Sequence, residues 1–379
     1  GILRSMKGKA SMVENSRRTS IMSDVFSFLK IILFLYLFLV SIDLMGSAFK
    51  ASGKGFADTL MRTTANPFIG LVIGIVVTSI IQSSSTTTSI IVTMVAAGTL
   101  PLRSAIPMVM GANIGTTVTN TIVSFGYAGR KIEFERSFGA SIVHDMFNIY
   151  AVCILFPLEL YTGIIFRTAT LAEKAFEGIG GFKFTSPLKM ILHPVSKPIA
   201  GFVGNHWLLL IIAFAGLFMS MSGIVRNMRG IVMEKIERVL NRYLFRNALI
   251  SLVFGIIFTS IVQSSSITTS IIIPLVGAGL LTVEQIFPYT LGANIGTTIT
   301  ALLAVLALDA GKEAAMTIAL CHLTFNIFGI AILYPLRVLP IRTAKSIASF
   351  VSESRRHFVI FLAIYVLLHI LPIIFATLF

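Results

Sequence analysis

Charged residues are scarce in this chain of 379 residues, where Asp, Glu, Lys and Arg together make up 12%. An average soluble domain carries about 25% charged residues. Hydrophobic residues reach 55%, with 30 Phe and 15 Met, and the mean hydropathy is +0.91. So little polar surface cannot cover a soluble globule, which argues against a soluble enzyme, a disordered chain or a coiled coil. The composition predicts an integral membrane protein.

Cysteines and acidic residues are also few. The two cysteines, Cys153 and Cys321, both lie inside apolar runs, which favours buried free thiols over a disulfide. With 16 acidic and 30 basic residues, the net charge is +14. The basic residues form short clusters beside apolar runs, which is typical of the positive-inside bias of membrane proteins and not of a nucleic-acid-binding face. We therefore expect contact with the lipid bilayer and no nucleic-acid partner.

Long apolar runs predict several spanning helices, because a straight helix needs about 20 apolar residues to cross a bilayer. They are expected at about residues 25–47, 134–160, 207–225, 313–338 and 357–379. The predicted organisation is a cytoplasmic basic tail (1–24), an N-terminal spanning helix and connection (25–65), a first transport repeat (66–160), a central polar loop with a spanning helix and a basic linker (161–247), a second transport repeat (248–338), and a connection with a C-terminal spanning helix (339–379).

An internal repeat is the strongest feature of the sequence. Residues 82–90 and 263–271 are identical at eight of nine positions, and residues 111–117 and 292–298 are identical throughout, both at an offset of 181 residues. At an offset of 178, four further residues of the first half match four of the second: His144, Phe147, Asn148 and Pro157 pair with His322, Phe325, Asn326 and Pro335. Chance does not produce this pattern.

Each repeat interrupts an apolar run with polar residues. The runs 70–81 and 248–262 both end at Gln-Ser-Ser-Ser. Broken apolar segments at matching positions in two halves are the best sequence pointer to a transporter's binding site. Because unpaired backbone groups cannot face lipid, we expect each Gln-Ser-Ser-Ser to be the tip of a re-entrant helical hairpin. Each Gly-Ala-Asn-Ile-Gly-Thr-Thr is expected to be an unwound point in the next helix, with its glycines supplying backbone freedom.

The two Gln-Ser-Ser-Ser runs offer amides and hydroxyls but no fixed charge. Such groups both donate and accept hydrogen bonds, so one site can hold an oxyanion at N–H and O–H donors and Na⁺ at oxygen ligands. A multiply charged anion in a low-dielectric pocket is very costly unless cations arrive with it. That cost gives a physical basis for obligatory coupling of the two solutes.

These motifs resemble those of the type II sodium/phosphate cotransporters. The resemblance rests on residues 82–90, 110–123 and 137–148 and on the repeated motifs of the second half, and it covers about 66–338. It implies Na⁺-driven uptake of inorganic phosphate by an all-α polytopic membrane protein. It further implies two inverted structural repeats, both termini in the cytoplasm and the central loop outside.

Carried over position by position, the resemblance implies a set of binding residues. Phosphate would contact Gln82, Ser83, Ser84, Ser85, Gln263, Ser264, Ser265 and Ser266. Sodium would be held by Gln82, Ser85, Asn113, Thr116, Thr117, Gln263, Ser266, Asn294, Thr297 and Thr298. Electrogenic members carry an Asp where this chain has Arg130, which calls a third sodium ion and net charge movement into question.

Simpler interpretations exist for these residues. Small and hydroxyl residues also serve as packing contacts between membrane helices, but six consecutive hydroxyls from Ser83 to Thr88 face every direction of a helix, so packing alone does not explain them. Asp145 occurs only in the first half, where a helix-end or pairing role is favoured over an ion ligand.

Two histidines are assigned supporting roles. His144 and His322 each precede an asparagine by four residues, Asn148 and Asn326, which places each pair on one helix face. The spacing leaves open whether these residues couple protons or make a structural hydrogen bond to the hairpin.

We therefore predict a multi-pass secondary transporter of the plasma or inner membrane, with termini in the cytoplasm, that couples Na⁺ influx to phosphate uptake by alternating access. No cofactor is expected beyond the co-transported Na⁺, and a homodimer is possible. The alternatives are a Na⁺-coupled transporter of another oxyanion such as sulfate, and an anion channel. An enzyme is not predicted, because the repeats hold no nucleophile–His–Asp set, paired carboxylates or metal cluster.

Overall fold

This computed structural model describes residues 2–52, 58–59, 61–178, 188–240, 247–308 and 310–378. Side chains are described throughout these ranges except at 2–25, 176–178, 188–189, 225, 228–240 and 368–378. The described part of the chain is mostly helical. The helices are α1 (Ile2–Ala51), α3 (Pro67–Ile81), α4 (Ser84–Ala96), α5 (Leu102–Gly115), α6 (Val118–Phe125), α7 (Lys131–Thr162), α8 (Ile164–Gly178), α9 (Leu188–Val203), α10 (His206–Leu240), α11 (Ala248–Val262), α12 (Ser265–Ser270), α13 (Ile273–Gly277), α14 (Val283–Ala307), α15 (Lys312–Leu333), α16 (Val338–Glu353) and α17 (Arg355–Leu378).

Five helices in the described ranges are long and apolar enough to cross a membrane: Phe26–Ala51, Lys131–Thr162, His206–Ile224, Val283–Ala307 and Lys312–Leu333. Four of them coincide with predicted spans. The fifth, Val283–Ala307, includes the segment for which an unwound helix was expected. The expected C-terminal span coincides with α17, part of whose side chains lie outside the described set, as do those of the predicted basic tail.

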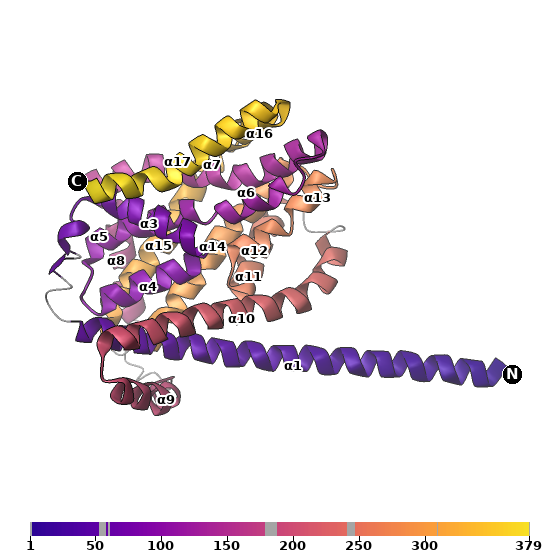
Figure 1. Cartoon of the computed structure of the whole chain (residues 1–379), viewed down its shortest axis with the longest axis horizontal. Coiled ribbons are helices and arrows are strands. Elements are labelled where there is room, and N and C mark those ends of the chain that lie inside the picture. Colours follow the sequence, from indigo (N-terminus) through magenta and orange to yellow (C-terminus); the bar gives the residue numbers. More distant parts are fainter. Residues whose placement is uncertain are drawn as a thin grey trace.

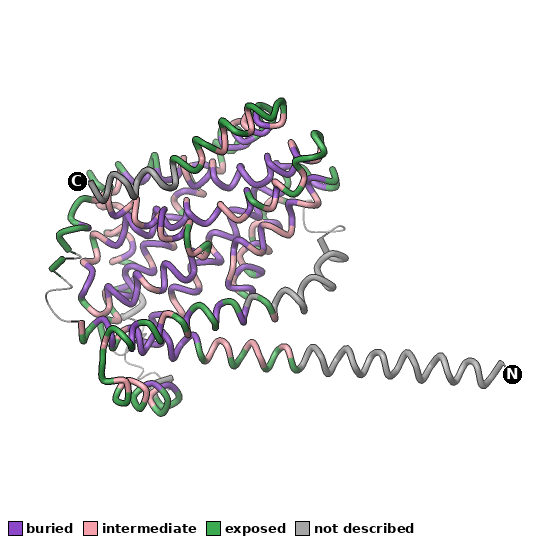
Figure 2. The backbone as a smooth tube through the Cα atoms, in the orientation of Figure 1, coloured by how far each residue is buried: buried purple, intermediate pink, exposed green. Residues whose placement is uncertain are grey.

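The helices pack into one body around a buried centre (Figure 1). Helix α1 runs beside α10, and α16 lies against α7. The closest packing within each repeat joins equivalent helices, α3 with α5 and α11 with α14. Figure 2 shows that buried residues run through the central helices, whereas exposed residues concentrate on outer elements such as α9.

The glycines of the repeated Gly-Ala-Asn-Ile-Gly-Thr-Thr motif allow this close packing. A Cβ at Gly111 would lie 2.0 Å from the carbonyl oxygen of Leu71, and one at Gly292 would lie 2.0 Å from that of Leu252. Helix α14 is continuous through its copy of the motif. The prediction of an unwound helix is therefore wrong for the second half. The glycines permit close helix approach there, as in small-residue membrane interfaces.

In the first half, the same motif ends a helix. Helix α5 stops at Gly115 and α6 begins at Val118, so Thr116 and Thr117 interrupt the helix. Both threonines keep right-handed helical dihedrals. The predicted break is thus present in the first half as a two-residue interruption and not as an extended unwound stretch.

The central segment also differs from the expected loop. Residues 161–206 contain helices α8 and α9, and α10 continues through the expected basic linker as far as Leu240. Helix α9 includes Pro194 and Pro198. A proline normally breaks or kinks a helix, but α9 remains helical and packs against α1. Tertiary packing has therefore overridden the local preference of the prolines for a break.

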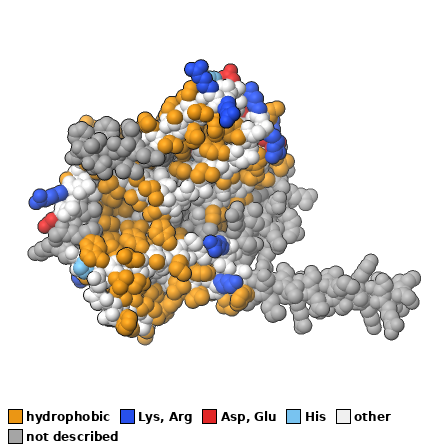
Figure 3. All heavy atoms as spheres, viewed as in Figure 1, with side chains coloured by type: hydrophobic (Ala, Val, Ile, Leu, Met, Phe, Trp, Pro, Cys, Tyr) orange, Lys and Arg blue, Asp and Glu red, His pale blue; other side chains and the backbone are white. Residues whose placement is uncertain are grey.

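The surface fits a protein that contacts lipid. On the face drawn in Figure 3, hydrophobic side chains cover broad areas, and Lys and Arg side chains gather mainly along the upper edge. Exposed apolar side chains include Ile211 and Met219 of α10 and Ile257 of α11. Cys321 is buried as expected, whereas Cys153 is exposed, which corrects the expectation that it is buried; both are free thiols.

Candidate functional site

Both Gln-Ser-Ser-Ser runs separate two helices, and they do so with the same backbone geometry. Gln82 and Gln263 adopt left-handed backbone angles, φ 56° and 58°, and they are the non-glycine residues with positive φ in the described ranges. This conformation costs about 1–2 kcal/mol in an L-residue, and such strain is concentrated at functional sites. Ser83 and Ser264 then cap the next helix, accepting hydrogen bonds from the backbone N–H of Thr86 (3.2 Å) and Ile267 (3.4 Å).

The two runs meet in the interior. The Ser85 hydroxyl donates to the Gln263 carbonyl oxygen at 3.2 Å. The Ser266 hydroxyl donates to the Thr116 carbonyl oxygen, also at 3.2 Å. Segments 178 and 150 residues apart in sequence are thus brought into direct contact.

The second serine of each run is buried with an uncommitted hydroxyl. Ser84 and Ser265 are each 3% exposed. Neither hydroxyl has a hydrogen-bond partner among the residues that the structure describes. Each is the first residue of its helix, α4 or α12. Neither oxygen is among the fully enclosed side-chain atoms without a partner in the described residues. Each hydroxyl is therefore unpaired and still accessible to a ligand.

The two glutamines differ in their surroundings. Gln82 is exposed, whereas Gln263 is 7% exposed. The Gln263 side chain donates to the Ser260 carbonyl oxygen and accepts from the Thr300 hydroxyl. The repeated sequence therefore has one open and one closed tip in this conformation.

A second polar network joins the two halves through the predicted supporting residues. His144 Nε2 donates to Asn294 Oδ1 (2.6 Å), and His322 Nε2 donates to Asn113 Oδ1 (2.9 Å). The asparagine side chains add hydrogen bonds between the two halves: the Asn113 amide donates to Asn326 Oδ1 at 2.7 Å, and the Asn294 amide donates to Asn148 Oδ1 at 2.8 Å. Every member is at most 4% exposed. Each histidine thus contacts the Gly-Ala-Asn motif of the opposite half, not the hairpin.

The remaining predicted residues have mostly local contacts. The hydroxyls of Thr116, Thr117, Thr297 and Thr298 each donate to a carbonyl of their own helical turn, at 2.7–3.0 Å. A hydroxyl that donates in this way keeps its lone pairs free for a cation. Asn113 and Asn294 lie in the histidine network, so the expected sodium ligands divide between the serine contact and that network.

Several polar residues at the contact were not predicted. The Thr300 hydroxyl also donates to Ser85 Oγ at 3.3 Å. Asn120 donates to the Thr269 hydroxyl at 2.8 Å, another bond between the halves. Thr300 pairs with Thr119 at the repeat offset of 181, and extending the repeat comparison beyond residue 117 could have found it.

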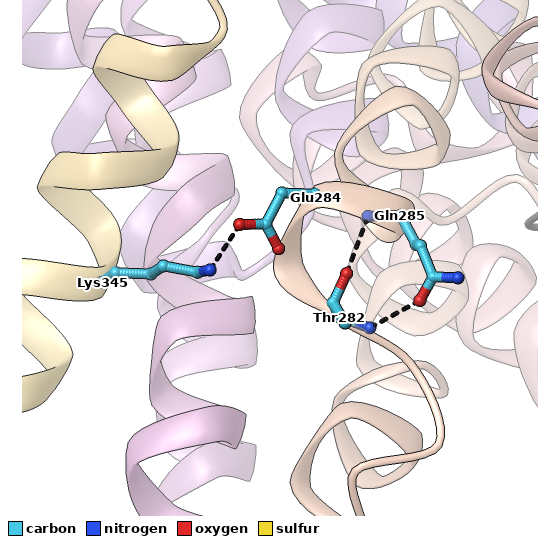
Figure 4. A network of polar contacts seen from close by, with 4 residues as sticks. All are labelled: Thr282, Glu284, Gln285 and Lys345. Atoms are coloured by element: carbon cyan, nitrogen blue, oxygen red, sulfur yellow. Dashed lines mark hydrogen bonds and ion pairs between the residues drawn. The ribbon is translucent and has the colours of Figure 1, made fainter.

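A cleft of about 500 Å³ lies away from these serines, lined by residues of α7, α13, α14 and α16. Its charged lining includes Glu135, Arg136 and Lys345. Lys345 pairs with Glu284, next to the Thr282–Gln285 capping box that begins α14 (Figure 4). The cleft therefore combines acidic and basic side chains, and it contains none of the predicted site residues.

Comparison with known proteins supports the assignment of a family. The profile described as Na+/Pi-cotransporter matches residues 37–182 and 216–351. Sodium-dependent phosphate transport protein 2A of Rattus norvegicus is 36% identical over 414 residues, covering 88% of this chain and 65% of the relative. Protein 2B of Bos taurus is 32% identical (90% and 63%), and protein 2B of Homo sapiens is 31% identical (86% and 62%). The chain thus spans slightly less than two thirds of these relatives' lengths. No solved structure matches it.

Proposed function

The chain belongs to the Na+/Pi-cotransporter family, and from that premise we propose that it couples Na⁺ influx to the uptake of inorganic phosphate. Its relatives are named sodium-dependent phosphate transport proteins. The multi-pass membrane architecture, with five candidate spans in the described ranges, supports a transporter.

One observation carries the proposal: the two repeated serine segments meet, and each contains a buried serine, Ser84 or Ser265, whose hydroxyl has no hydrogen-bond partner in the described residues. The α4 N-terminus adds backbone N–H donors and the positive end of a helix dipole, which favours an oxyanion such as phosphate. Carbonyl oxygens and the lone pairs of the threonine hydroxyls favour Na⁺. We assign phosphate to the two Gln-Ser-Ser-Ser runs and sodium to the surrounding oxygens.

The absence of fixed charge from both runs supports coupling. Phosphate brings negative charge into a buried site whose hydroxyls and amides cannot neutralise it. Burying an uncompensated charge is very costly, so phosphate and Na⁺ stabilise each other's binding. A channel has no such requirement, and this interdependence favours a cotransporter.

The difference between the tips supports alternating access. In this proposal, residues 66–160 and 248–338 are inverted repeats whose Gln-Ser-Ser-Ser tips belong to re-entrant hairpins. The open Gln82 tip and the closed Gln263 tip represent one of two access states. In the other state the tips exchange surroundings, and the ions leave on the opposite side. We further propose a plasma or inner membrane location with cytoplasmic termini; a homodimer stays a prediction.

Uptake by the purified chain in proteoliposomes tests the proposal. Ser84→Ala and Ser265→Ala should each reduce Na⁺-dependent uptake of labelled phosphate by at least about tenfold, because each removes a hydroxyl hydrogen bond to a charged ligand. Ser79→Ala and Ser260→Ala are matched controls, since these equivalent serines only donate to carbonyls of their own helices at 2.7 Å. Unchanged uptake in both test variants would contradict the site assignment.

The same vesicles test the transported anion. Unlabelled arsenate should compete with phosphate, because both are tetrahedral oxyanions that carry protons near neutral pH. Sulfate should compete weakly. Stronger competition by sulfate than by phosphate itself would favour another oxyanion as substrate, and accumulation independent of Na⁺ would contradict coupling.

A further inference from the structure

The cleft of about 500 Å³ between α7, α13, α14 and α16 lies where two candidate membrane spans begin, Lys131–Thr162 and Val283–Ala307. At about 1.5 Å per residue, these helices of 32 and 25 residues are about 48 and 38 Å long, more than the hydrocarbon core of about 30 Å. The charged residues of their first turns, such as Glu133 and Glu284, keep these ends out of the hydrocarbon. The cleft therefore lies at the level of the lipid headgroups.

Two charged side chains in the lining of this cleft are unpaired. Glu135 and Arg136 form no ion pair or hydrogen bond, with each other or with any other side chain that the structure describes. Arg136 lies across the turn between α13 and α14, since a Cβ at Gly279 would lie 2.6 Å from its Nη1 atom. Lys345, in contrast, is paired with Glu284 (Figure 4). The cleft thus offers one unpaired negative and one unpaired positive group.

Apolar side chains form the rest of the wall. Val276 and Leu281 line the cleft and are buried, whereas Ile132 lines it and is 65% exposed. Leu280, which lies between two lining residues, is 62% exposed. A small polar solute would leave these apolar groups without contact. The combination of two opposite charges with an open apolar rim fits an amphiphile with a zwitterionic end.

The equivalent place in the other half lacks these charges. Gly98 corresponds to Gly279 at the offset of 181 and has the same left-handed backbone, with φ 73° against 76°. No described atom lies within 4 Å of a Cβ built at Gly98. At the offset of 178, Arg136 corresponds to Ala314. The fold of the repeat therefore does not require an arginine over this turn.

We infer that the cleft binds the headgroup of a zwitterionic aminophospholipid such as phosphatidylethanolamine. Its phosphate contacts the Arg136 guanidinium, its ammonium group contacts the Glu135 carboxylate, and its glycerol and upper acyl chains lie against Ile132 and Leu280. Both polar contacts are charge-assisted hydrogen bonds, which are stronger than neutral ones. A choline headgroup has no N–H to donate to Glu135, and phosphatidylglycerol has no cation to neutralise it. The volume of the cleft is within the range of about 300–1,000 Å³ that is typical of small-molecule sites.

Lipid binding to the purified, delipidated full-length chain tests the inference. The probes are dioleoyl lipids with ethanolamine, choline or glycerol headgroups, and binding is measured as lipid adducts in native mass spectrometry and as the rise in Tm in detergent. The wild type should bind the ethanolamine lipid about tenfold more tightly than either of the others, because each of those lacks one charge-assisted contact.

Two variants assign the contacts. Arg136→Gln should weaken binding of the ethanolamine lipid by about tenfold. Glu135→Gln should remove the preference for the ethanolamine lipid over phosphatidylglycerol. Glu313→Gln is the matched control, because Glu313 is the equivalent of Glu135 at the offset of 178 and is an exposed residue of α15 outside the cleft. It should keep the wild-type preference.

Equal affinities of the wild type for the three lipids would overturn the inference, and this comparison needs no variant. Free phosphoethanolamine that binds as tightly as the lipid would also overturn it, because a soluble ligand would then be sufficient. So would a preference for the ethanolamine lipid that persists in both Arg136→Gln and Glu135→Gln. These measurements involve no transport, so their outcome is independent of the proposed function.

Discussion

The two halves of the molecule place the same Gln-Ser-Ser-Ser sequence in different surroundings. In both halves the glutamine is left-handed and the first serine caps the next helix. In the second half, Gln263 is buried and hydrogen-bonded by Thr300. In the first half, Gln82 is exposed, and the Thr119 hydroxyl, equivalent to that of Thr300, has no hydrogen-bond partner in the described residues.

The helices that follow the tips differ as well. Helix α4 is continuous over 13 residues. In the second half, α12 ends after 6 residues, and Pro274 is the second residue of the helix that follows, α13. Proline has no backbone N–H to continue a helix, which explains the interruption before it. The repeated motif therefore determines the local backbone geometry, while the flanking residues determine which polar groups find hydrogen-bond partners. Alternating access requires this kind of inequality between related halves.

The largest expected effect is a loss of folding stability, and it should be the same in both halves. Gly111→Ala and Gly292→Ala each place a Cβ 2.0 Å from a backbone carbonyl oxygen of the facing helix. Overpacking of this kind should lower the free energy of unfolding by about 3 kcal/mol or more, measured by thermal unfolding in detergent. Gly201→Ala is the control, since its Cβ meets open space. Tolerance of the change in only one half would break the structural equivalence.

The next effect should separate the halves. Gln263→Ala should lower the free energy of unfolding by about 2 kcal/mol, because Thr300 and Ser260 lose a buried partner. Gln82→Ala should change it by less than about 0.5 kcal/mol, because Gln82 is exposed. Both variants keep a non-glycine residue at positive φ, so backbone strain cancels in the comparison. Equal losses would show that the two tips are in fact equally closed.

Chemical labelling should resolve the same difference kinetically. In a background without Cys153 and Cys321, Gln82→Cys should react with a polar maleimide at least about tenfold faster than Gln263→Cys, since a barrier of 1.4 kcal/mol to opening already gives that factor. Adding Na⁺ and phosphate together should narrow the ratio if the tips exchange surroundings. A ratio that does not respond to the two ions would argue against alternating access.

The smallest effect should again be symmetric. Double-mutant cycles to alanine should give coupling energies of about 1 kcal/mol for both crossed pairs, His144 with Asn294 and His322 with Asn113. The control cycle joins His144 to Asn113, whose side chains share no hydrogen bond in the described structure, and should give less than about 0.5 kcal/mol. Clearly unequal couplings for the crossed pairs would limit the symmetry to the backbone.

Much of the candidate site follows from local sequence signals. An apolar run that stops at Gln82 or Gln263 predicts that the helix ends there, and α3 and α11 do end before these glutamines. The serine caps of α4 and α12 were not predicted, although serine is a favoured helix cap and the signal is local. The prediction that the motif glycines unwind the helix was wrong for α14. These glycines allow another helix to approach closely, and no local sequence pattern reports that distance.

Composition and short-range preferences are properties of the chain alone, and they were sufficient to predict the membrane class, the duplicated motif and the two helix ends at Gln82 and Gln263. The tertiary structure decided which groups meet: the crossing of histidines and asparagines between halves and the closed environment of Gln263. Contacts between residues about 150 or more apart depend on how whole helices pack, and identical motifs therefore have different partners.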